Sequence, residues 1–256
     1  MNFTIDFNCD LGEDETPEGE QREAAILPSV TSINVACGYH AGSAKHMRRT
    51  MAAAAARAIA IGAHPSLPDR EHFGRRELQV SAEDVYDDML YQIGAAEAIA
   101  RSVGAKLNHV KPHGALYNMA ARDRRLADAI ARAIRDFDPG LVLFGLSGSR
   151  LLEAGSALGL SCANEVFADR TYQSDATLTP RSRPDALIRD PEIAVMQVMR
   201  MLREQVVATV DGREIPIIAE TVCIHGDSPN APLFAARLRS ALESAGIAIR
   251  PIIRGN

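Results

Sequence analysis

Residues 106–145 have the sequence KLNHVKPHGALYNMAARDRRLADAIARAIRDFDPGLVLFG. Short apolar runs at residues 106–110 and 141–145 predict two β-strands, and the apolar residues of 123–137 recur with the spacing of a helix. A helix of this length between two strands is typical of parallel pairing through a right-handed crossover. This stretch therefore predicts an α/β fold built on a parallel sheet.

The same alternation of strand and helix extends outward in both directions. Further strands are predicted at residues 3–9, 32–36, 60–63, 161–165 and 221–224. Further helices are predicted at residues 43–59, 81–103, 149–158, 191–204 and 229–245. Ser81 with Asp84 is close to a capping box, and Gly104 follows the same helix, so its start and its stop are both signalled.

Residues 206–218 do not follow this alternation. Two β-rich runs flank Asp211-Gly212, which is a strong hairpin signal, and we interpret the segment as an excursion from the main fold. No linker, low-complexity tract or internal repeat divides the 256 residues. Because α/β barrels commonly have about 250 residues, we expect one catalytic domain over residues 1–256.

The composition argues against several partners. A net charge of −5 and a pI near 5.8 are unlike those of a protein whose main partner is nucleic acid or an anionic membrane. No apolar run approaches the roughly 18–20 residues that span a bilayer, and the N-terminus lacks the pattern of a signal peptide. We therefore expect a cytoplasmic protein. Its cysteines are far apart, and we interpret them as small core residues: Cys9, Cys37, Cys162 and Cys223.

Polar side chains follow most of the predicted strands. They are Asn8, Asp10, Glu13, His40, His64, His109, Lys111, His113, Glu165, Asp169, Arg170, His225 and Asp227. The carboxyl ends of parallel strands meet on one face, where such folds have their active sites. Five of the seven histidines lie at or just after a strand end. The pattern predicts an enzyme whose site lies on that face.

Two of these residues also have a structural interpretation. An aspartate such as Asp10 readily caps a turn, here through Leu11-Gly12. His64 precedes Pro65, which keeps its backbone extended and suits an aimed ligand, but a buried core histidine would fit as well.

Lys111-Pro112-His113-Gly114 is the most informative short segment. In an extended strand His109 and Lys111 project to the same side. A lysine beside histidines at a strand end is placed to hold a phosphate or to polarise a carbonyl group. The alternative is a surface lysine whose stem packs on apolar neighbours.

Residues 145–149, GLSGS, follow a strand and open a helix, so their backbone N–H groups could bind an anion. The alternative is a tight turn with a serine cap, since the segment matches no nucleotide-binding motif. Arg75, Arg76 and Arg170 are candidate clamps for a carboxylate or phosphate, because guanidinium binds such groups bidentately. We favour Arg170 among them.

Taken together, these segments resemble the LamB/YcsF family. The matching blocks, in the family's order, are residues 8–13 (NCDLGE), 36–42 (ACGYHAG), 62–65 (GAHP), 109–118 (HVKPHGALYN), 165–170 (EVFADR) and 223–227 (CIHGD). The resemblance implies a TIM-like (β/α) barrel, often seven-stranded, of the carbohydrate-deacetylase and glycoside-hydrolase type. It also implies hydrolysis of the cyclic amide 5-oxo-L-proline (pyroglutamate) to L-glutamate, with ATP as co-substrate and 5-oxoprolinase subunits B and C as partners.

Convergence at the strand ends and this resemblance together suggest roles for individual residues. Catalytic roles fall to Asp10, Lys111, His113 and Glu165, with a divalent metal, if one is bound, held by Asp10, His40 and His64. Substrate binding falls to Asn8, Arg170, His225 and Asp227. Nucleotide binding falls to Gly145, Ser147 and Gly148.

The chain departs from the family pattern at three places. Residues 14–21 form an acidic segment, Ser66 stands where we expect glycine, and Ala176 follows Asp175 where we also expect glycine. Two other functions compete with the first. One is a metal-dependent, deacetylase-like amidohydrolase that needs no ATP, and the other is a non-catalytic subunit that presents oxoproline to its partners.

Overall fold

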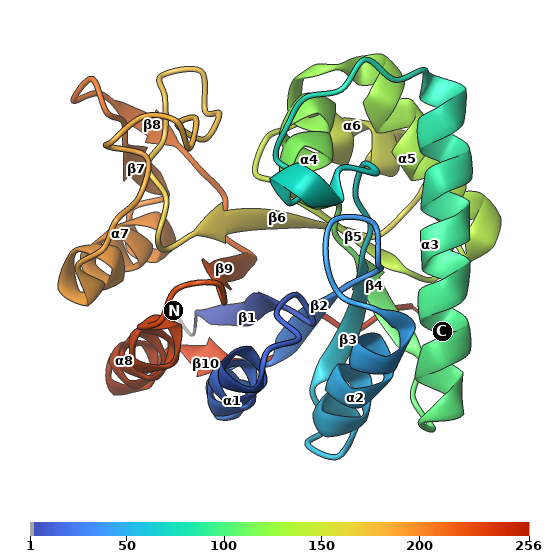
Figure 1. Cartoon of the computed structure of the whole chain (residues 1–256). Helices are drawn as coiled ribbons and strands as arrows, with labels where there is room; N and C mark the ends of the chain where they lie inside the picture. The colour runs from blue at the N-terminus through green and yellow to red at the C-terminus, as the bar shows by residue number, and fades with distance from the viewer. Residues whose placement is uncertain (1–2, 256) are drawn as a thin grey trace.

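The computed structural model describes residues 3–255, and its centre is a closed barrel of parallel strands (Figure 1). The barrel strands are β1 (Thr4–Leu11), β2 (Ser32–Ala36), β3 (Ala60–His64), β4 (Leu107–Val110), β5 (Val142–Leu146), β6 (Cys162–Phe167) and β9 (Thr221–His225). They pair in chain order, and β9 pairs with both β6 and β1, which closes the barrel. A short strand, β10 (Ala248–Ile249), extends the sheet beside the start of β1. The predicted seven-stranded α/β barrel is confirmed.

Helices surround this barrel on its outer side (Figure 1). Those predicted from the sequence are α2 (Ala44–Ala55), α3 (Ala82–Ser102), α5 (Arg124–Phe137), α6 (Arg150–Ala157), α7 (Pro191–Arg203) and α8 (Ala231–Ser244). The capping box of Ser81 and Asp84 is present at the start of α3. Helix α5 buries one continuous stripe that includes Leu126, Ile130 and Ile134, as its helical apolar spacing predicts.

Two helices are not predicted by the sequence patterns. Helix α1 (Pro17–Ile26) begins within residues 14–21, which we interpret from the sequence as an acidic loop. Its start has a Thr16 cap that accepts the Gly19 N–H, then proline, then acidic side chains, which together are favourable at a helix N-terminus. Helix α4 (Gly114–Arg122) begins directly after the loop that contains Lys111. The polar residues Lys111 and His113 stand out in the sequence, whereas the helical spacing of the apolar residues that follow them does not.

The interior of the barrel is unusually polar near its carboxyl-terminal end. Along β1, Phe7 and Cys9 belong to the apolar core, whereas Asn8 and Asp10 bond to residues of other strands. Asn8 donates to Glu165 on β6, a strand that does not neighbour β1. This alternation places the apolar residues under the helices and the polar residues inside the barrel.

The predicted hairpin is also present. Strands β7 (Val206–Ala208) and β8 (Glu214–Pro216) pair antiparallel around Gly212, whose φ of +81° suits a tight turn. The loop after β6 joins this hairpin through a bridge between Tyr172 and Thr209. Loop and hairpin form an extension beside the barrel (Figure 1).

Three of the four cysteines lie in the protein interior, as the sequence predicts. Cys9, Cys37 and Cys223 are buried, Cys162 is half-buried, and all four are free thiols. Within residues 3–255, no helix is long and apolar enough to cross a membrane.

Candidate active site

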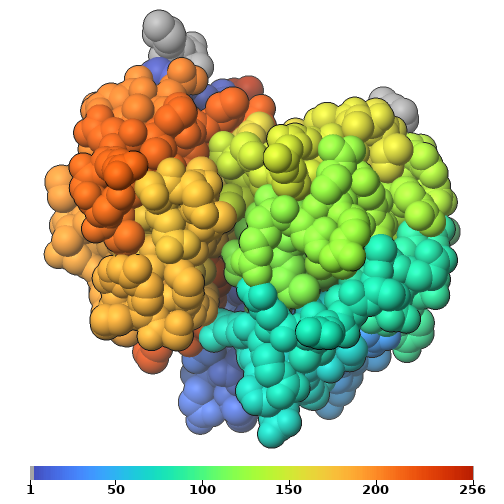
Figure 2. Space-filling view, turned by 90° about the horizontal axis from the view of Figure 1, so that it is seen from above, coloured from blue at the N-terminus to red at the C-terminus, as the bar shows by residue number. Residues whose placement is uncertain are grey.

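A cavity of about 310 Å³ opens at the carboxyl ends of the strands. Figure 2 looks onto this end of the molecule, where a cleft separates the extension after β6 from the segments around residues 70–125. Side chains from both sides line the cavity, among them Asp10, His64, Lys111, His113, Arg170 and Arg181. The convergence predicted from the sequence therefore exists.

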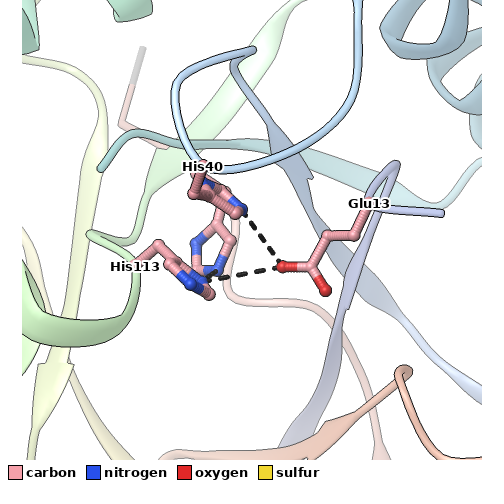
Figure 3. Close-up of side chains that lie close together, drawn as sticks. Glu13, His40 and His113 are labelled. Carbon is pink, nitrogen blue, oxygen red and sulfur yellow. Dashed lines mark hydrogen bonds and ion pairs between the residues drawn. The ribbon is translucent and has the colours of Figure 1, made fainter. Parts of the chain in front are cut away.

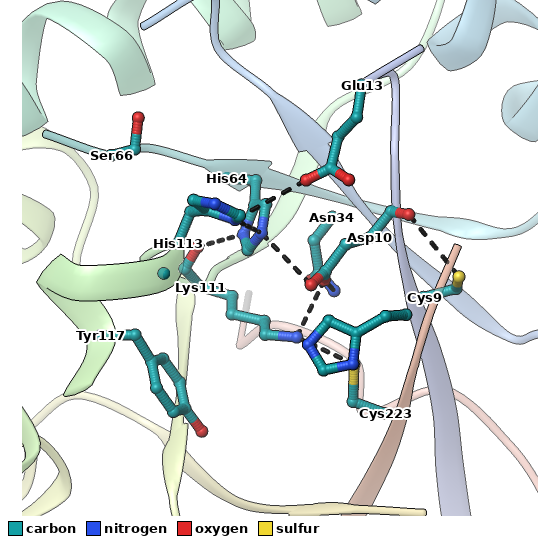
Figure 4. Close-up of polar contacts among 12 residues, drawn as sticks. Cys9, Asp10, Glu13, Asn34, His64, Ser66, Lys111, His113, Tyr117 and Cys223 are labelled. Carbon is teal, nitrogen blue, oxygen red and sulfur yellow. Dashed lines mark hydrogen bonds and ion pairs between the residues drawn. The ribbon is translucent and has the colours of Figure 1, made fainter. Parts of the chain in front are cut away.

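A buried lysine lies between two carboxyl groups at the floor of this cavity, and Figure 4 shows its contact with the first of them, Asp10. Lys111 Nζ is 2.8 Å from Asp10 Oδ1 and 2.9 Å from Glu165 Oε1, and each side chain is at most 5% exposed. Burial opposes the charge of Lys111, but Asp10 and Glu165 outweigh it and raise its pKa well above the usual value. His64 and Lys111 overcome the effect of burial on Asp10 and hold its pKa well below the usual value. The site thus contains a fixed ammonium group beside an ionised carboxylate.

Hydrogen bonds hold Glu165 and Asp10 in place. Asn8 donates to Glu165 Oε1 at 3.0 Å, and the Tyr117 hydroxyl donates to Oε2 at 2.7 Å. Asn34 donates to Asp10 Oδ1 at 2.8 Å, and its own carbonyl oxygen is 2.8 Å from His109 Nε2. Because these side chains are all buried, their positions are set before any ligand binds.

His109 belongs to the barrel interior and does not line the cavity. Its ring stacks on Phe144 at 4.1 Å, and burial lowers its pKa to about 3. It is therefore neutral and donates its Nε2 proton to Asn34. His109 thus supports the residues beneath the cavity.

Three histidines and one glutamate form a second group beside Asp10, and Figure 3 shows the contacts of Glu13 with His40 and His113. Glu13 Oε1 is 3.2 Å from His40 Nε2 and 3.6 Å from His113 Nδ1, and His64 Nε2 is 3.0 Å from His113 Nδ1. Burial lowers the pKa of both His40 and His113, and burial together with Asp10 raises the pKa of Glu13. The four nearest ligand atoms lie within 4.8 Å of one another, a spacing that a metal ion could bridge. Asp10 lies at the edge of this group, with Oδ2 3.4 Å from His64 Nε2.

Among the predicted substrate-binding residues, Arg170 and His225 line the cavity, and Asn8 lies just beneath it. The guanidinium of Arg170, however, already donates to the carbonyl oxygens of Thr179 and Ala186. His225 Nδ1 bonds to Asp169 at 2.8 Å.

Asp227 lies near the mouth of the cavity, where it forms an ion pair with Arg75 at 2.6 Å. The predicted nucleotide-binding turn lies farther away. Gly145, Ser147 and Gly148 do not line the cavity, although Leu146 between them does. The Ser147 hydroxyl accepts the Ile218 N–H.

Sequence reasoning missed several residues of the site. Glu13 follows the first strand but received no role, and Asn34 and Tyr117 were not singled out. Arg181, also missed, lines the cavity and is partly buried, and within residues 3–255 its guanidinium has no hydrogen bond or ion pair. The inward alternation along residues 32–36 could have found Asn34, and helical spacing from His113 could have found Tyr117.

A closed parallel barrel with charged groups at its carboxyl ends defines this chain as an α/β-barrel protein with an enzyme-type cavity. The profile of the LamB/YcsF family matches residues 5–255. The chain belongs to the LamB/YcsF family. The resemblance inferred from the sequence blocks is thus confirmed.

Three known proteins illustrate this relationship. The A subunit of the 5-oxoprolinase of Bordetella pertussis is 54% identical over 250 residues, which cover 98% of this chain and 99% of that protein. The crystal structure of a lactam utilization protein from Thermus thermophilus has a TM-score of 0.90 and 44% identity, and the match covers 98% of this chain and 100% of the other. A mutant CE4-family pseudoenzyme has a TM-score of 0.54 at 13% identity, over 98% of this chain and 66% of its own. The last likeness concerns the fold alone, and it agrees with the predicted deacetylase-type barrel.

Proposed function

We propose that this chain is the A subunit of a 5-oxoprolinase, which hydrolyses 5-oxo-L-proline to L-glutamate with ATP and with subunits B and C. The observation that carries the proposal is Lys111, held between Asp10 and Glu165 at the floor of the cavity. The names of two relatives, a 5-oxoprolinase component and a lactam utilization protein, support this substrate.

The chemistry explains why such a reaction needs ATP. A five-membered lactam is a resonance-stabilised amide that resists attack by water. Transfer of the γ-phosphoryl group of ATP to the lactam oxygen gives ADP and an activated ring. One water then adds to the ring carbon, and the C–N bond breaks as the nitrogen takes a proton, which leaves γ-glutamyl phosphate. A second water releases phosphate and L-glutamate.

The buried groups match the charges that develop in these steps. The ammonium of Lys111 would stabilise negative charge on the lactam oxygen or on the phosphoryl group. Asp10 is ionised and faces the cavity, so it is placed to accept a proton from the attacking water. Glu165 holds the other side of Lys111 and is the second candidate for proton transfer.

The substrate also has a carboxylate, which needs a cation at some distance from Lys111. Arg170, the residue predicted for this role, has two of its N–H groups bonded to backbone carbonyls. Arg181 lines the same cavity, and within residues 3–255 its guanidinium has no hydrogen-bond partner, so we add it to the proposal as the residue that binds the carboxylate. His225 and Asp227 would complete the mouth of the site.

Nucleotide binding at Gly145, Ser147 and Gly148 remains part of the proposal, although these three residues do not line the cavity themselves. Leu146 of the same turn reaches the cavity wall, so a phosphate held at this turn would lie beside the substrate site. The partner subunits would supply the remaining contacts to ATP.

A specific observation favours a second candidate function. The group formed by Glu13, His40, His64 and His113 is a suitable set of metal ligands, and the fold is shared with a CE4-family protein. A metal-dependent amidohydrolase of the deacetylase type would use this group without ATP.

Release of glutamate from 5-oxoproline separates these functions. The purified chain is assayed with and without ATP, and with and without subunits B and C of the same enzyme. We expect turnover only when ATP and both partners are present. Turnover of an amide by the chain alone, with no ATP, would instead establish the amidohydrolase. Binding of oxoproline with turnover that survives Lys111→Ala and Asp10→Asn at saturation would establish a protein that only presents the substrate.

A further inference from the structure

The outer nitrogens of two histidines have fixed partners that can only accept hydrogen bonds. His64 Nδ1 is 2.7 Å from the carbonyl oxygen of Lys111, and His113 Nε2 is 2.8 Å from the carbonyl oxygen of Phe73. A carbonyl oxygen has no proton to give, so each of these ring nitrogens carries an N–H group that donates. These contacts fix which nitrogen of each ring points its N–H group outward and which nitrogen faces the other histidine.

The third histidine is fixed by a hydroxyl group. His40 Nδ1 is 2.9 Å from Ser66 Oγ, and the Ser66 hydroxyl donates to the carbonyl oxygen of Leu67 at 3.1 Å. A hydroxyl has a single proton, so Ser66 Oγ accepts the proton of His40 Nδ1. Ser66 stands where the family pattern leads us to expect glycine, and in this chain its side chain orients a histidine.

The inner nitrogens of the three rings therefore point into one group, where each can offer a lone pair to a cation. His64 Nε2 and His113 Nδ1 are 3.0 Å apart, and two lone pairs at that distance cannot bond without a cation or a proton between them. His40 Nε2 in turn faces Glu13 Oε1 at 3.2 Å (Figure 3). Four possible ligand atoms thus lie within 4.8 Å of one another, and the outer nitrogen of each histidine ring is hydrogen-bonded to another residue.

We propose that His40 Nε2, His64 Nε2, His113 Nδ1 and the Glu13 carboxylate bind one divalent transition-metal ion such as Zn²⁺. Bonds of about 2.0–2.1 Å in tetrahedral geometry place ligand atoms roughly 3.3 Å apart. Three contacts within the group, of 3.0, 3.2 and 3.6 Å, bracket this value, and all four ligand atoms lie within 4.8 Å of one another. Buried histidines whose outer N–H groups are held by fixed acceptors are the usual surroundings of such an ion.

The ligand chemistry distinguishes this ion from the magnesium that accompanies ATP. Mg²⁺ prefers six oxygen ligands and keeps several waters, whereas three imidazoles and one carboxylate suit Zn²⁺ or a neighbouring transition metal. When bound, such an ion supplies a Lewis acid beside the cavity.

The ligand set also differs from the one that the sequence suggested. Asp10 Oδ1 is already held by Lys111 and Asn34, and only Oδ2 faces His64, at 3.4 Å. Asp10 is thus a neighbour of the ion and not a ligand. His113 becomes a ligand in place of the acid or base that its position in the sequence indicated. The inference concerns metal binding alone and does not depend on the proposed reaction.

Metal binding to the whole purified chain tests this inference directly. After treatment with a chelator, the protein is titrated with Zn²⁺ by calorimetry and with Co²⁺ by visible absorption spectroscopy. We expect one ion per chain, visible Co²⁺ bands typical of four or five nitrogen and oxygen ligands, and no comparable binding of Mg²⁺. If no ion binds, or if the Co²⁺ spectrum is that of a six-oxygen site, the proposal is wrong. Hydrogen bonds among the three histidines and Glu13 would then hold the group together without a metal.

Variants then identify the ligands. His40→Ala and His113→Ala should each weaken Zn²⁺ binding at least 100-fold, and Ser66→Ala should weaken it roughly 10- to 100-fold through the orientation of His40. His72→Ala is the matched control, because His72 is exposed and bonds to Asp69 outside the group. Circular dichroism confirms that each variant is folded, and Glu13→Gln provides a smaller change at a fourth ligand. Unchanged affinity in the folded histidine variants would contradict the ligand set.

Discussion

Lys111 Nζ and Asp10 Oδ1 are 2.8 Å apart at the floor of the barrel cavity, and both side chains are almost completely buried. Lys111 follows β4 and Asp10 lies on β1, two strands that are not neighbours in the barrel. The contact therefore crosses the interior, where it joins a charged pair that lies 101 residues apart in the chain. A buried pair of this kind is strongly destabilising when only one partner is removed.

The stability of variants at this pair follows from that principle. Lys111→Met leaves the buried carboxyl groups of Asp10 and Glu165 without their cation, and we expect the free energy of unfolding to fall by about 3–5 kcal/mol. Asp10→Asn in the same chain removes the negative charge of Asp10, so the double variant should be more stable than Lys111→Met alone. Denaturant unfolding of the single and double variants measures the difference, and a double variant less stable than both single variants would contradict this account.

The pH dependence of stability has one identifiable contribution from Asp6. Its carboxyl is fully buried, and burial outweighs the hydroxyl groups of Ser32, Thr221 and Thr31, so that the pKa rises from 3.8 to about 6. Between these values the folded protein keeps a proton that the unfolded chain has released. The contribution of Asp6 to the free energy of unfolding therefore decreases as the pH rises through this range.

Asp6→Asn should remove this dependence. The stability of the variant relative to the wild type should increase by up to about 3 kcal/mol between pH 4 and pH 6, and it should stay constant above that range. Urea unfolding at pH 4, 5, 6 and 7 measures both proteins. A stability difference that does not change with pH would show that Asp6 has an ordinary pKa.

Ala176 adopts a backbone conformation that glycine prefers. Its φ is +66°, in the left-handed region, and it stands where the family pattern leads us to expect glycine. Ala176→Gly should raise the free energy of unfolding by about 1 kcal/mol, because the left-handed conformation costs alanine roughly 1–2 kcal/mol. Ala52→Gly, within helix α2, should have the opposite sign. Thermal unfolding compares the two, and loss of stability in Ala176→Gly would contradict the strain.

The two cavity arginines should respond differently to substitution. Arg181→Ala should raise the KM for 5-oxoproline roughly 10- to 100-fold without loss of stability, because its guanidinium lines the cavity and bonds to no other group within residues 3–255. Arg170→Ala should instead destabilise the protein by about 1–3 kcal/mol, since it leaves the carbonyls of Thr179 and Ala186 unsatisfied. Arg183→Ala, in the same loop but exposed, is the control. An unchanged KM in Arg181→Ala would contradict carboxylate binding by Arg181 and favour Arg170 as the residue that binds the carboxylate.

Much of the fold could be predicted because local patterns agree with it. All seven barrel strands were located from short apolar runs, and the Asp211-Gly212 signal located the hairpin. Helix α1 was missed because its acidic first turn resembles a solvated loop, although Thr16 and Pro17 mark its start. The residues of that segment are compatible with either a loop or a helix, and packing against α8 favours the helix.

For the site, the sequence predicts which strand ends carry charged residues, but not how their side chains contact one another. Asp10, His64 and Lys111 were found because they end strands, which parallel pairing brings to one face. Sequence spacing does not show which side-chain atoms meet, so it did not predict the contact of Glu13 with His40 beside that of Asp10 with His64. Nor does any local pattern indicate the ion pair that Lys111 forms with Asp10 across the barrel.

Turnover of the reconstituted enzyme with a single change at Lys111 tests the central claim most directly. The Lys111→Met chain, checked for folding, is assayed for ATP-dependent glutamate release with subunits B and C, beside Lys106→Met, which alters an exposed lysine just before β4. We expect kcat to fall at least 100-fold in Lys111→Met and to stay at the wild-type value in Lys106→Met. Wild-type turnover by a folded Lys111→Met chain would contradict the account.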